Sequence, residues 1–243
     1  MLETLYCISL RTVKYSDSSS IVTLWTRERG RVSAVVPSGS GREAQRRRAI
    51  MMPLGTFEAV AVGSAGTDIV RLRDVRPMGL SVAVSGDPVK GAVAIFIAEF
   101  LYTVLRDSAP DGHMSDFLFD WTAILAGASR GRLANFPMAF IYNIGHFLGI
   151  EPDAGSYAPG AYFDMRQGRF TSTLPLGHTR VLDPDAARVV HMLSRLHRRN
   201  YHLLRLNRLQ RNQILDLMME YYNIHLAPLT SITSLDILRA VLG

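Results

Sequence analysis

Arginine is the residue type whose distribution in this chain points most directly to chemistry. Between Arg11 and Arg48, nine basic residues stand against three acidic ones, and between Arg188 and Arg211 seven arginines occur without any acidic residue. The whole chain carries a formal net charge of +6, so the remainder of the chain is negative overall. A guanidinium group binds two phosphate oxygens at once and stacks on bases. The two clusters therefore predict contact with a polyanion, for which nucleic acid is the natural candidate.

The first cluster is the predicted nucleic-acid-binding set, and the family resemblance described below implies DNA as its ligand. It includes three successive arginines at the end of segment 37–48 (PSGSGREAQRRR), which favours an exposed loop or a short basic helix. Basic side chains of this kind hold phosphates without reading the base sequence, so binding should depend steeply on salt. Tyr15 and Trp25 are the aromatic candidates for base stacking, although the apolar run around Trp25 is better explained as core. The set is Arg11, Lys14, Arg27, Arg29, Arg31, Arg42, Arg46, Arg47 and Arg48.

The second cluster begins in segment 183–198, which is predicted to be helical. At positions i, i+7 and i+11, Arg188, Arg195 and Arg199 would share one helical face. That face suits either DNA or an acidic protein tail, and a simple solvated surface is an equal alternative. The set is Arg188, Arg195, Arg198, Arg199, Arg205 and Arg208, followed by Arg211.

Patterns typical of catalysis are absent from the sequence. It contains no HExxH, GxSxG, P-loop lysine or GxGxxG motif. The carboxylate pairs Asp107/Asp111 and Asp183/Asp185 adjoin prolines at expected helix boundaries, where capping explains them better than an acid–base site. The single cysteine, Cys7, excludes an internal disulfide framework and a cysteine-based zinc site. We therefore expect a protein that is not an enzyme and has no metal or cofactor.

The elements that must position the arginines begin as β-structure. Five short runs rich in β-formers, separated by turns such as those at 28–30 and 63–66, predict five strands. Five strands in about 75 residues suggest a small barrel or sandwich, and five is the strand count of an OB-fold. The predicted strands are 5–13, 20–26, 31–36, 52–62 and 67–75.

After Pro77 the pattern becomes helical. Asp87 and Pro88 form a good helix start, because an N-cap is followed by proline at the first helical position. Segment 151–179 is poor in helix signals and contains a predicted hairpin at 162–170. The predicted helices are 88–107, 113–126, 135–149, 183–198, 207–226 and 234–242. The expected domains are a barrel at 1–79 and a helical domain at 80–243 with an irregular insertion at about 150–180, and the boundary lies near 78–86.

This order of elements, together with particular strings, resembles the bacterial RecO family of recombination mediator proteins. Residues 5–39 are similar to the opening barrel strands of the family, 57–77 to its closing strands, and 214–242 to its last two helices. The similarity extends over nearly the whole chain, and the order and spacing of the strings carry it. The resemblance implies an α+β fold, in which an N-terminal OB-fold barrel precedes an all-helical domain.

The resemblance also implies a function. RecO-like proteins bind single- and double-stranded DNA, anneal complementary strands and work with RecR to help RecA replace the single-stranded DNA-binding protein SSB. The acidic C-terminal tail of SSB is then the natural partner for the second arginine cluster. We expect a cytoplasmic, nucleoid-associated protein without a membrane segment, since no run of 18 apolar residues occurs.

The chain departs from the family pattern in one segment. Many members carry a four-cysteine zinc module between the helices, whereas residues 149–179 contain no cysteine. We expect a metal-free loop there, held by Tyr157, Tyr162, Phe163 and Phe170.

Two other function classes compete with this interpretation. An RNA-binding accessory protein would use the same basic barrel, and affinities for DNA and RNA of equal length would separate the two. A hydrolase or nuclease would need clustered carboxylates with a metal, which the sequence does not offer.

Overall fold

The computed structural model describes residues 2–62, 69–79, 86–226, 228–229 and 232–242. Contacts within the chain define two compact units, which are described separately below. Unit 1 contains Met1–Ser129 and Ile232–Val241, and unit 2 contains Arg130–Ser231 and Leu242–Gly243. The domain boundary near 79 stays a prediction, and most of the segment proposed for it (80–85) lies outside the described residues.

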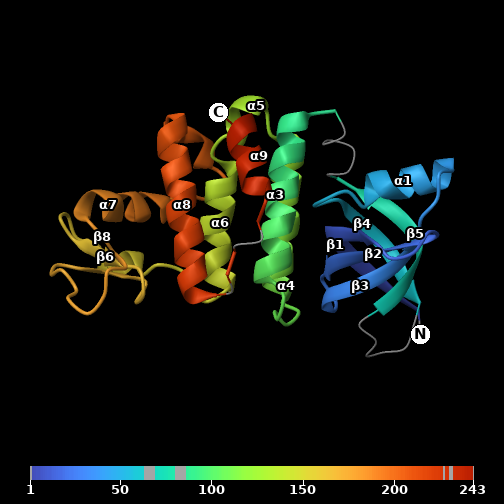
Figure 1. Ribbon diagram of the computed structural model, residues 1–243, viewed down its shortest axis with the longest axis horizontal. Coiled ribbons are helices and arrows are strands. Elements are labelled where there is room, and N and C mark those ends of the chain that lie inside the picture. The colour runs from blue at the N-terminus through green and yellow to red at the C-terminus, as the bar shows by residue number, and fades with distance from the viewer. Residues whose placement is uncertain (1, 63–68, 80–85, 227, 230–231, 243) are drawn as a thin grey trace. The chain divides into compact units, whose positions relative to one another are not determined.

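Unit 1 begins with a closed five-stranded barrel (Figure 1). The strand order is β1-β2-β3-β5-β4, in which β3 and β5 are parallel and the other neighbours are antiparallel. This confirms the predicted α+β class with an OB-type barrel at the N-terminus. The strands are β1 (Leu2–Lys14), β2 (Ser19–Thr26), β3 (Gly30–Pro37), β4 (Thr56–Val62) and β5 (Ile69–Met78).

Two predicted strand limits, those of the fourth and fifth strands, are not reproduced in the described residues. The start of the fourth strand at Met52 is wrong, because residues 51–54 form a turn in which Leu54 adopts a φ of 60°. The predicted turn at 63–66 and the first two residues of the predicted fifth strand lie outside the described residues. At Gly30 the structure does confirm a turn residue with positive φ (66°), which glycine adopts without strain.

The barrel core follows from the two-residue alternation along its strands. Leu5, Cys7, Val22 and Leu24 belong to an interior cluster that Phe57 completes, and each of these side chains is fully buried. Burial raises the pKa of the Cys7 thiol far above its ordinary value, with a smaller contribution from Glu28, so this cysteine is inert.

The basic segment after β3 forms a helix rather than a loop, α1 (Arg42–Ile50). Ile50 and the next residue, Met51, are buried in the barrel core, and they anchor the end of α1 to the barrel. The other side chains of α1 are exposed or half-buried, which is why its sequence carries so little apolar character.

Two long helices and a short one complete unit 1. Asp87 and Asp111 accept hydrogen bonds from backbone N–H groups at the starts of the two long helices, which confirms them as N-caps. Glu99 accepts hydrogen bonds from the backbone and side chains of Thr233 and Ser234 and so holds the start of the short helix. The helices are α3 (Pro88–Val104), α4 (Gly112–Gly127) and α9 (Ser234–Val241).

The outward face of β1 and β2 is covered within unit 1. Ile8 and Trp25 are directly paired across these strands and fully buried, although both alternate away from the barrel interior. The Trp25 indole donates a hydrogen bond of 3.0 Å to the Ser115 hydroxyl on α4. The interpretation of Trp25 as a core residue is therefore confirmed.

Unit 2 combines helices with a three-stranded sheet of order β7-β6-β8. The predicted hairpin at 162–170 is present as β6 and β7. The predicted helix 183–198 is shorter than expected and ends at Leu193, since the Asn200 side chain accepts from His197 N–H and donates to Arg195 C=O to stabilise a turn. The elements are α5 (Arg130–Leu133), α6 (Phe136–Phe147), η1 (Ala154–Ser156), β6 (Tyr162–Asp164), β7 (Arg169–Thr171), β8 (Val181–Leu182), α7 (Pro184–Leu193), η2 (Tyr201–Leu203) and α8 (Arg208–His225).

Among the described residues, each helix is too short or too polar to traverse a bilayer.

Candidate nucleic-acid interface

The arginines of α1 form the most accessible part of the first cluster. Arg42, Arg46 and Arg48 are exposed, whereas Arg47 is half-buried and pairs with Glu43 one turn earlier at 2.9 Å. Glu43 at the start of the helix and Arg47 and Arg48 at its end complement the helix dipole and stabilise the helix. Arg42 and Arg46 make no ion pair within the described part of the chain, so their charge faces solvent.

A second row of arginines lies on β5 and was missed by the analysis of the sequence. Arg71, Arg73 and Arg76 are exposed and lie opposite Val62, Val60 and Glu58 of β4. These three partners alternate along β4, so they share its outward face. The three arginines consequently point to one side of the barrel.

An irregularity in β5 produces this alignment. Asp74 has a φ of 51°, and the register of β4 and β5 shifts between Glu58 and Val60. Such a bulge inserts one extra residue and restores the outward direction three positions after Arg73 rather than two. The two-residue spacing of Arg71 and Arg73 in the sequence could have indicated that both point outward from a strand. The outward direction of Arg76 depends on the bulge, which the sequence does not indicate.

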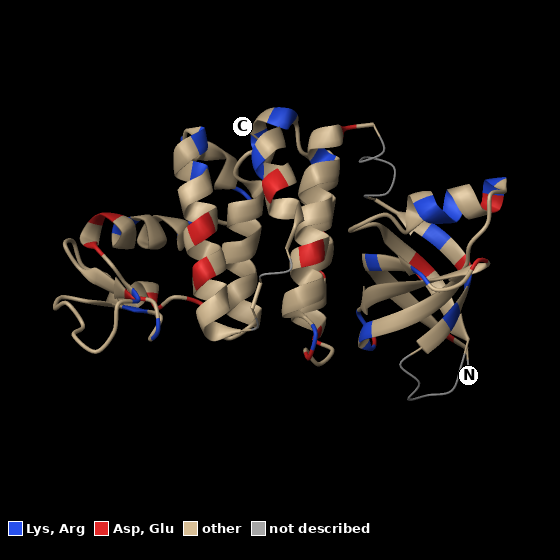
Figure 2. Ribbon diagram, viewed as in Figure 1, with Lys and Arg blue, Asp and Glu red and all other residues tan. Residues whose placement is uncertain are grey.

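The arginines of α1 lie close to those of β5. A hollow of about 470 Å³ is lined by residues of α1 and β5. Its lining includes three arginines, two acidic residues and apolar neighbours, namely Arg46, Arg47, Arg73, Glu43, Asp74, Ile50, Leu72 and Val75. Figure 2 shows basic residues on α1 and on strands of the barrel next to it. We name the surface made by Arg42, Arg46, Arg48, Arg71, Arg73 and Arg76 the α1/β5 basic surface.

Three predicted binding residues have internal partners in unit 1. Arg27 pairs with Asp116 of α4 at 2.9 Å, and Arg29 donates from Nε to Glu3 at 2.7 Å. Arg31 lies over the Tyr102 ring, 4.4 Å from its centroid, and donates to the Tyr102 carbonyl oxygen at 2.8 Å. These contacts give the three side chains a structural role, while their contribution to DNA binding stays a prediction.

The remaining members of the first cluster lie on β1. Arg11 is exposed and lies 4.9 Å from the centre of the Tyr102 ring, and Lys14 forms an exposed ion pair with Asp17 at 3.0 Å. Tyr15, in the following loop, is 68% exposed. Because Trp25 is buried, Tyr15 is the one of the two predicted aromatic residues that is accessible for base stacking.

The structure does not place Arg188, Arg195 and Arg199 on one helical face, so that prediction was wrong. Arg188 is exposed on α7, but Arg195 and Arg199 lie in the turns that follow its end at Leu193. Arg198 is exposed in the same turns, Arg205 is exposed before α8, and Arg208 is the first residue of α8.

Exposed leucines accompany the last of these arginines in unit 2. Leu203 is 68% exposed and Leu209 is 66% exposed, and they flank Arg205 and Arg208 in the sequence. Arg211 instead donates to the carbonyl oxygens of Leu206 and Leu242, so it has a structural role.

The cysteine-free insertion is held together by aromatic contacts. The Phe170 ring lies 5.1 Å from that of Tyr157 and 4.9 Å from that of Phe163, and Tyr157 stacks on His191 at 3.9 Å. Tyr162 contributes through its backbone pairing in the sheet. These contacts pack the insertion together and attach it to α7.

Hydrogen bonds to the side chain of Asp164 also stabilise the insertion. One oxygen of the buried Asp164 accepts from the backbone N–H groups of Arg166 and Gln167, and the other lies 3.3 Å from Nε2 of His178. Nδ1 of His178 accepts from Arg180 N–H, so its Nε2 donates to Asp164 in the neutral ring. Among the described residues there is no group of three or more His, Cys, Asp or Glu that could hold a metal ion.

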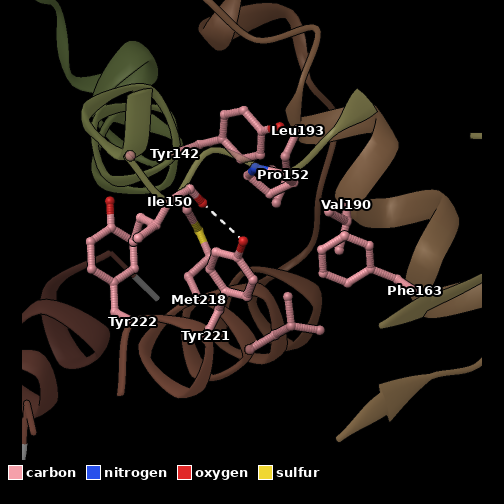
Figure 3. Close-up of a pocket in the computed structure, with 11 residues that line it drawn as sticks. Tyr142, Ile150, Pro152, Phe163, Val190, Leu193, Met218, Tyr221 and Tyr222 are labelled. Atoms are coloured by element: carbon pink, nitrogen blue, oxygen red, sulfur yellow. Dashed lines mark hydrogen bonds between the residues drawn. The ribbon is translucent and has the colours of Figure 1, made fainter. Parts of the chain in front are cut away.

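The apolar cavity of unit 2 is too small for a ligand. It measures about 30 Å³ and is lined by side chains of α6, α7 and α8, including Tyr142, Val190 and Met218 (Figure 3). That volume is about the space of one water molecule in the liquid. Tyr221 donates from its hydroxyl to Ile150 C=O at 2.9 Å, and burial raises its pKa to about 12. The cavity lies where the insertion packs against α6, α7 and α8.

Comparison with known proteins relates the whole chain to one family. Residues 1–80 match the family model described as "Recombination protein O N terminal". A curated DNA repair protein RecO from Phocaeicola vulgatus is 33% identical over 239 residues, which cover 98% of each chain. The chain belongs to the RecO family. The RecO proteins of Porphyromonas gingivalis and Bacteroides fragilis are 34% and 31% identical and cover 96% and 98% of each chain, respectively.

Membership of the RecO family confirms the resemblance drawn from the sequence strings. The family model spans the residues of the barrel and α1, and thus all six arginines of the α1/β5 basic surface. The RecO relatives continue through unit 2, so the insertion without cysteine lies inside the matched length.

Proposed function

We propose that this RecO-family chain is a DNA-binding recombination mediator. In this proposal it binds single- and double-stranded DNA, anneals complementary strands and, with RecR, helps load RecA onto SSB-coated DNA. The observation that carries DNA binding is the α1/β5 basic surface, where six exposed arginines on two adjacent elements face solvent. This work takes place in the cytoplasm, at the nucleoid.

The arginines support binding through the phosphate backbone. The Arg71–Arg73–Arg76 row and the arginines of α1 offer guanidinium groups at several points of one surface, which suits a polyanion more than a single anion. Phosphate contacts of this kind position a strand but carry no sequence information, as a general mediator requires.

Annealing follows from charge neutralisation. Two complementary strands repel each other through their phosphates, and arginines that neutralise one strand lower the cost of approach for the second. Such a process forms and breaks no covalent bond and needs no ATP, so we propose that the chain is not an enzyme.

In this proposal the acidic C-terminal tail of SSB binds to unit 2. The exposed Leu203 and Leu209 offer apolar contact, and Arg205 and Arg208 beside them offer positive charge. An acidic tail with hydrophobic residues is complementary to both features.

The test is annealing of complementary single-stranded DNA by the full chain. The variant R42A/R46A/R48A should anneal several-fold more slowly than wild type at moderate salt, whereas the charge-matched variant R106A/R130A/R166A should retain the wild-type rate. ATP and chelator should leave the wild-type rate unchanged. Equal annealing rates for both triple variants would show that the arginines of α1 do not contribute to DNA binding. A wild-type chain that neither anneals nor binds DNA would overturn the proposed function.

RNA is the alternative ligand, since a surface that reads phosphates also accepts an RNA backbone. Binding of DNA and RNA of the same length and sequence separates the two proposals. A consistent preference for RNA would favour an RNA-binding accessory protein.

A further inference from the structure

One mouth of the barrel is hollow beneath α1. The hollow measures about 340 Å³ and lies between α1, the loop after it, and the ends of β1, β2 and β3. Its floor is apolar, with the buried Val22, Val36 and Met51 at the bottom and Met52 and Pro53 on one wall. Ligand sites commonly occupy the mouths of β-barrels, and pockets range from roughly 300 to 1,000 Å³. This hollow is at the small end of that range.

The geometry of α1 directs one of its faces into the hollow. Ala44, Arg47, Arg48 and Met51 stand at i, i+3, i+4 and i+7, so they line one side of the helix and all belong to the hollow. Ala44 is small, and its position leaves open the space that a larger side chain would fill. This face therefore presents a gap over an apolar floor, with two guanidinium groups at its edge.

The rim of the hollow is polar and positively charged. The Ser20 and Ser38 hydroxyls are hydrogen-bonded to each other at 2.6 Å, and Thr12 stands on the neighbouring strand. Arg48 donates to Gly39 C=O with one nitrogen and is exposed, which leaves other N–H groups for an anion. None of the described residues that line the hollow is acidic. An occupant with an apolar body and an anionic end matches this lining.

We propose that the barrel mouth beneath α1 receives one unstacked nucleobase of single-stranded DNA, with a flanking phosphate on Arg48. This inference rests on the proposed function and assigns a subsite to it. The base would lie on Met51, Met52 and Pro53, while the hydroxyl rim contacts its edge without selecting one base. Sulfur atoms and apolar side chains are suitable partners for a flat ring because thioethers are polarisable.

The surroundings favour DNA over an acidic peptide as the occupant. Tyr15, 68% exposed in the loop beside β2, provides a stacking surface for a neighbouring base. The exposed Arg46 of α1 provides contact for a further phosphate. In addition, the outward side of β1 and β2 is blocked around Ile8 and Trp25. The hollow between α1 and β5 has the acidic Glu43 and Asp74 in its lining, whereas the mouth of the barrel has no acidic residue among the described residues that line it.

The experiment uses the full chain and an oligothymidylate that carries one 2-aminopurine, whose fluorescence rises when the base leaves its stack. Ala44→Leu fills the hollow and keeps every arginine. Ala49→Leu is the matched control, because Ala49 lies on the exposed side of the same helix and does not line the hollow. Thr12→Leu fills the hollow from the opposite wall, in case the change in α1 disturbs folding. Far-UV circular dichroism and thermal melting check that each variant folds.

We expect fluorescence to rise on binding to wild type and A49L, and to stay low with A44L and T12L, whose affinity falls by about tenfold. An unchanged rise with folded A44L, or bound DNA without any rise in the wild type, would overturn the subsite while the proposed function stands. Failure of wild type to bind DNA at all would overturn the proposed function as well. Weaker binding of an acidic peptide by A44L, with an unchanged fluorescence rise, would assign the hollow to protein instead.

Discussion

Arg73 and Arg76 stand three residues apart on β5, yet they point to the same outward side of the barrel. Their partners on β4 are Val60 and Glu58, which are two residues apart, and the extra residue is accommodated where Asp74 adopts a φ of 51°. A regular strand would have turned Arg76 toward the interior, where an unpaired guanidinium is strongly disfavoured. The bulge thus extends the Arg71–Arg73 pair into a row of three.

The row predicts a specific salt dependence. The variant R71A/R73A/R76A should bind single-stranded DNA more weakly, and its slope of log K against log salt should be shallower by about 2, because each phosphate contact contributes about 0.7. Fluorescence anisotropy titrations from low to moderate salt measure the slope. The variant R106A/R130A/R166A removes the same charge from other exposed positions and should keep the wild-type slope. A slope that changes equally in both would show an effect of net charge alone.

The bulge itself can be tested at Asp74. A left-handed backbone conformation is tolerated by Gly, Asn and Asp but disfavoured for a β-branched residue. Asp74→Val should therefore lower the free energy of unfolding by about 1 kcal/mol, whereas Asp74→Gly should leave it unchanged or raise it. Denaturant unfolding measures both. In addition, D74V should weaken DNA binding through misplacement of Arg76. Equal free energies of unfolding for D74V and D74G would contradict the left-handed backbone conformation at residue 74.

Glu99 predicts a pH dependence of stability in unit 1. Burial works to raise its pKa, but hydrogen bonds from the side chain and backbone of Ser234 and from Thr233 outweigh it, so the pKa is lowered in the folded state. A lowered folded pKa stabilises the protein fully above the unfolded pKa of glutamate, and this contribution is lost as the pH falls through the folded pKa. The melting temperature of wild type should therefore decline on acidification below about pH 4.3, the ordinary value for glutamate.

Glu99→Gln isolates that contribution. The variant should melt at a lower temperature than wild type at neutral pH, and the difference should shrink as the pH is lowered. Glu43→Gln, at an exposed surface pair, is the control and should follow the wild-type profile closely. A constant difference between E99Q and wild type at every pH would show that the charge of Glu99 is not what holds the start of α9.

Much of the local structure was predictable because it depends on neighbours in the sequence. The alternation along β1 to β3 identified strands, and Asp87-Pro88 identified the start of α3 through its cap and proline geometry. The end of α7 was not predictable in the same way, because the turn after it depends on side-chain hydrogen bonds of Asn200. The predicted helix was therefore too long, and it placed Arg195 and Arg199 on a helical face that the structure does not have.

The sequence by itself determined the class of fold, the family and the concentration of arginine in two segments, since composition and period are local properties of the chain. The tertiary structure decided which arginines are accessible. Arg27 and Arg31 meet partners 89 and 71 residues away, and Arg76 faces outward through a bulge. Trp25 became core because Ser115 and its helix cover it. Such pairings depend on contacts between distant segments, and only the folded chain brings those segments together.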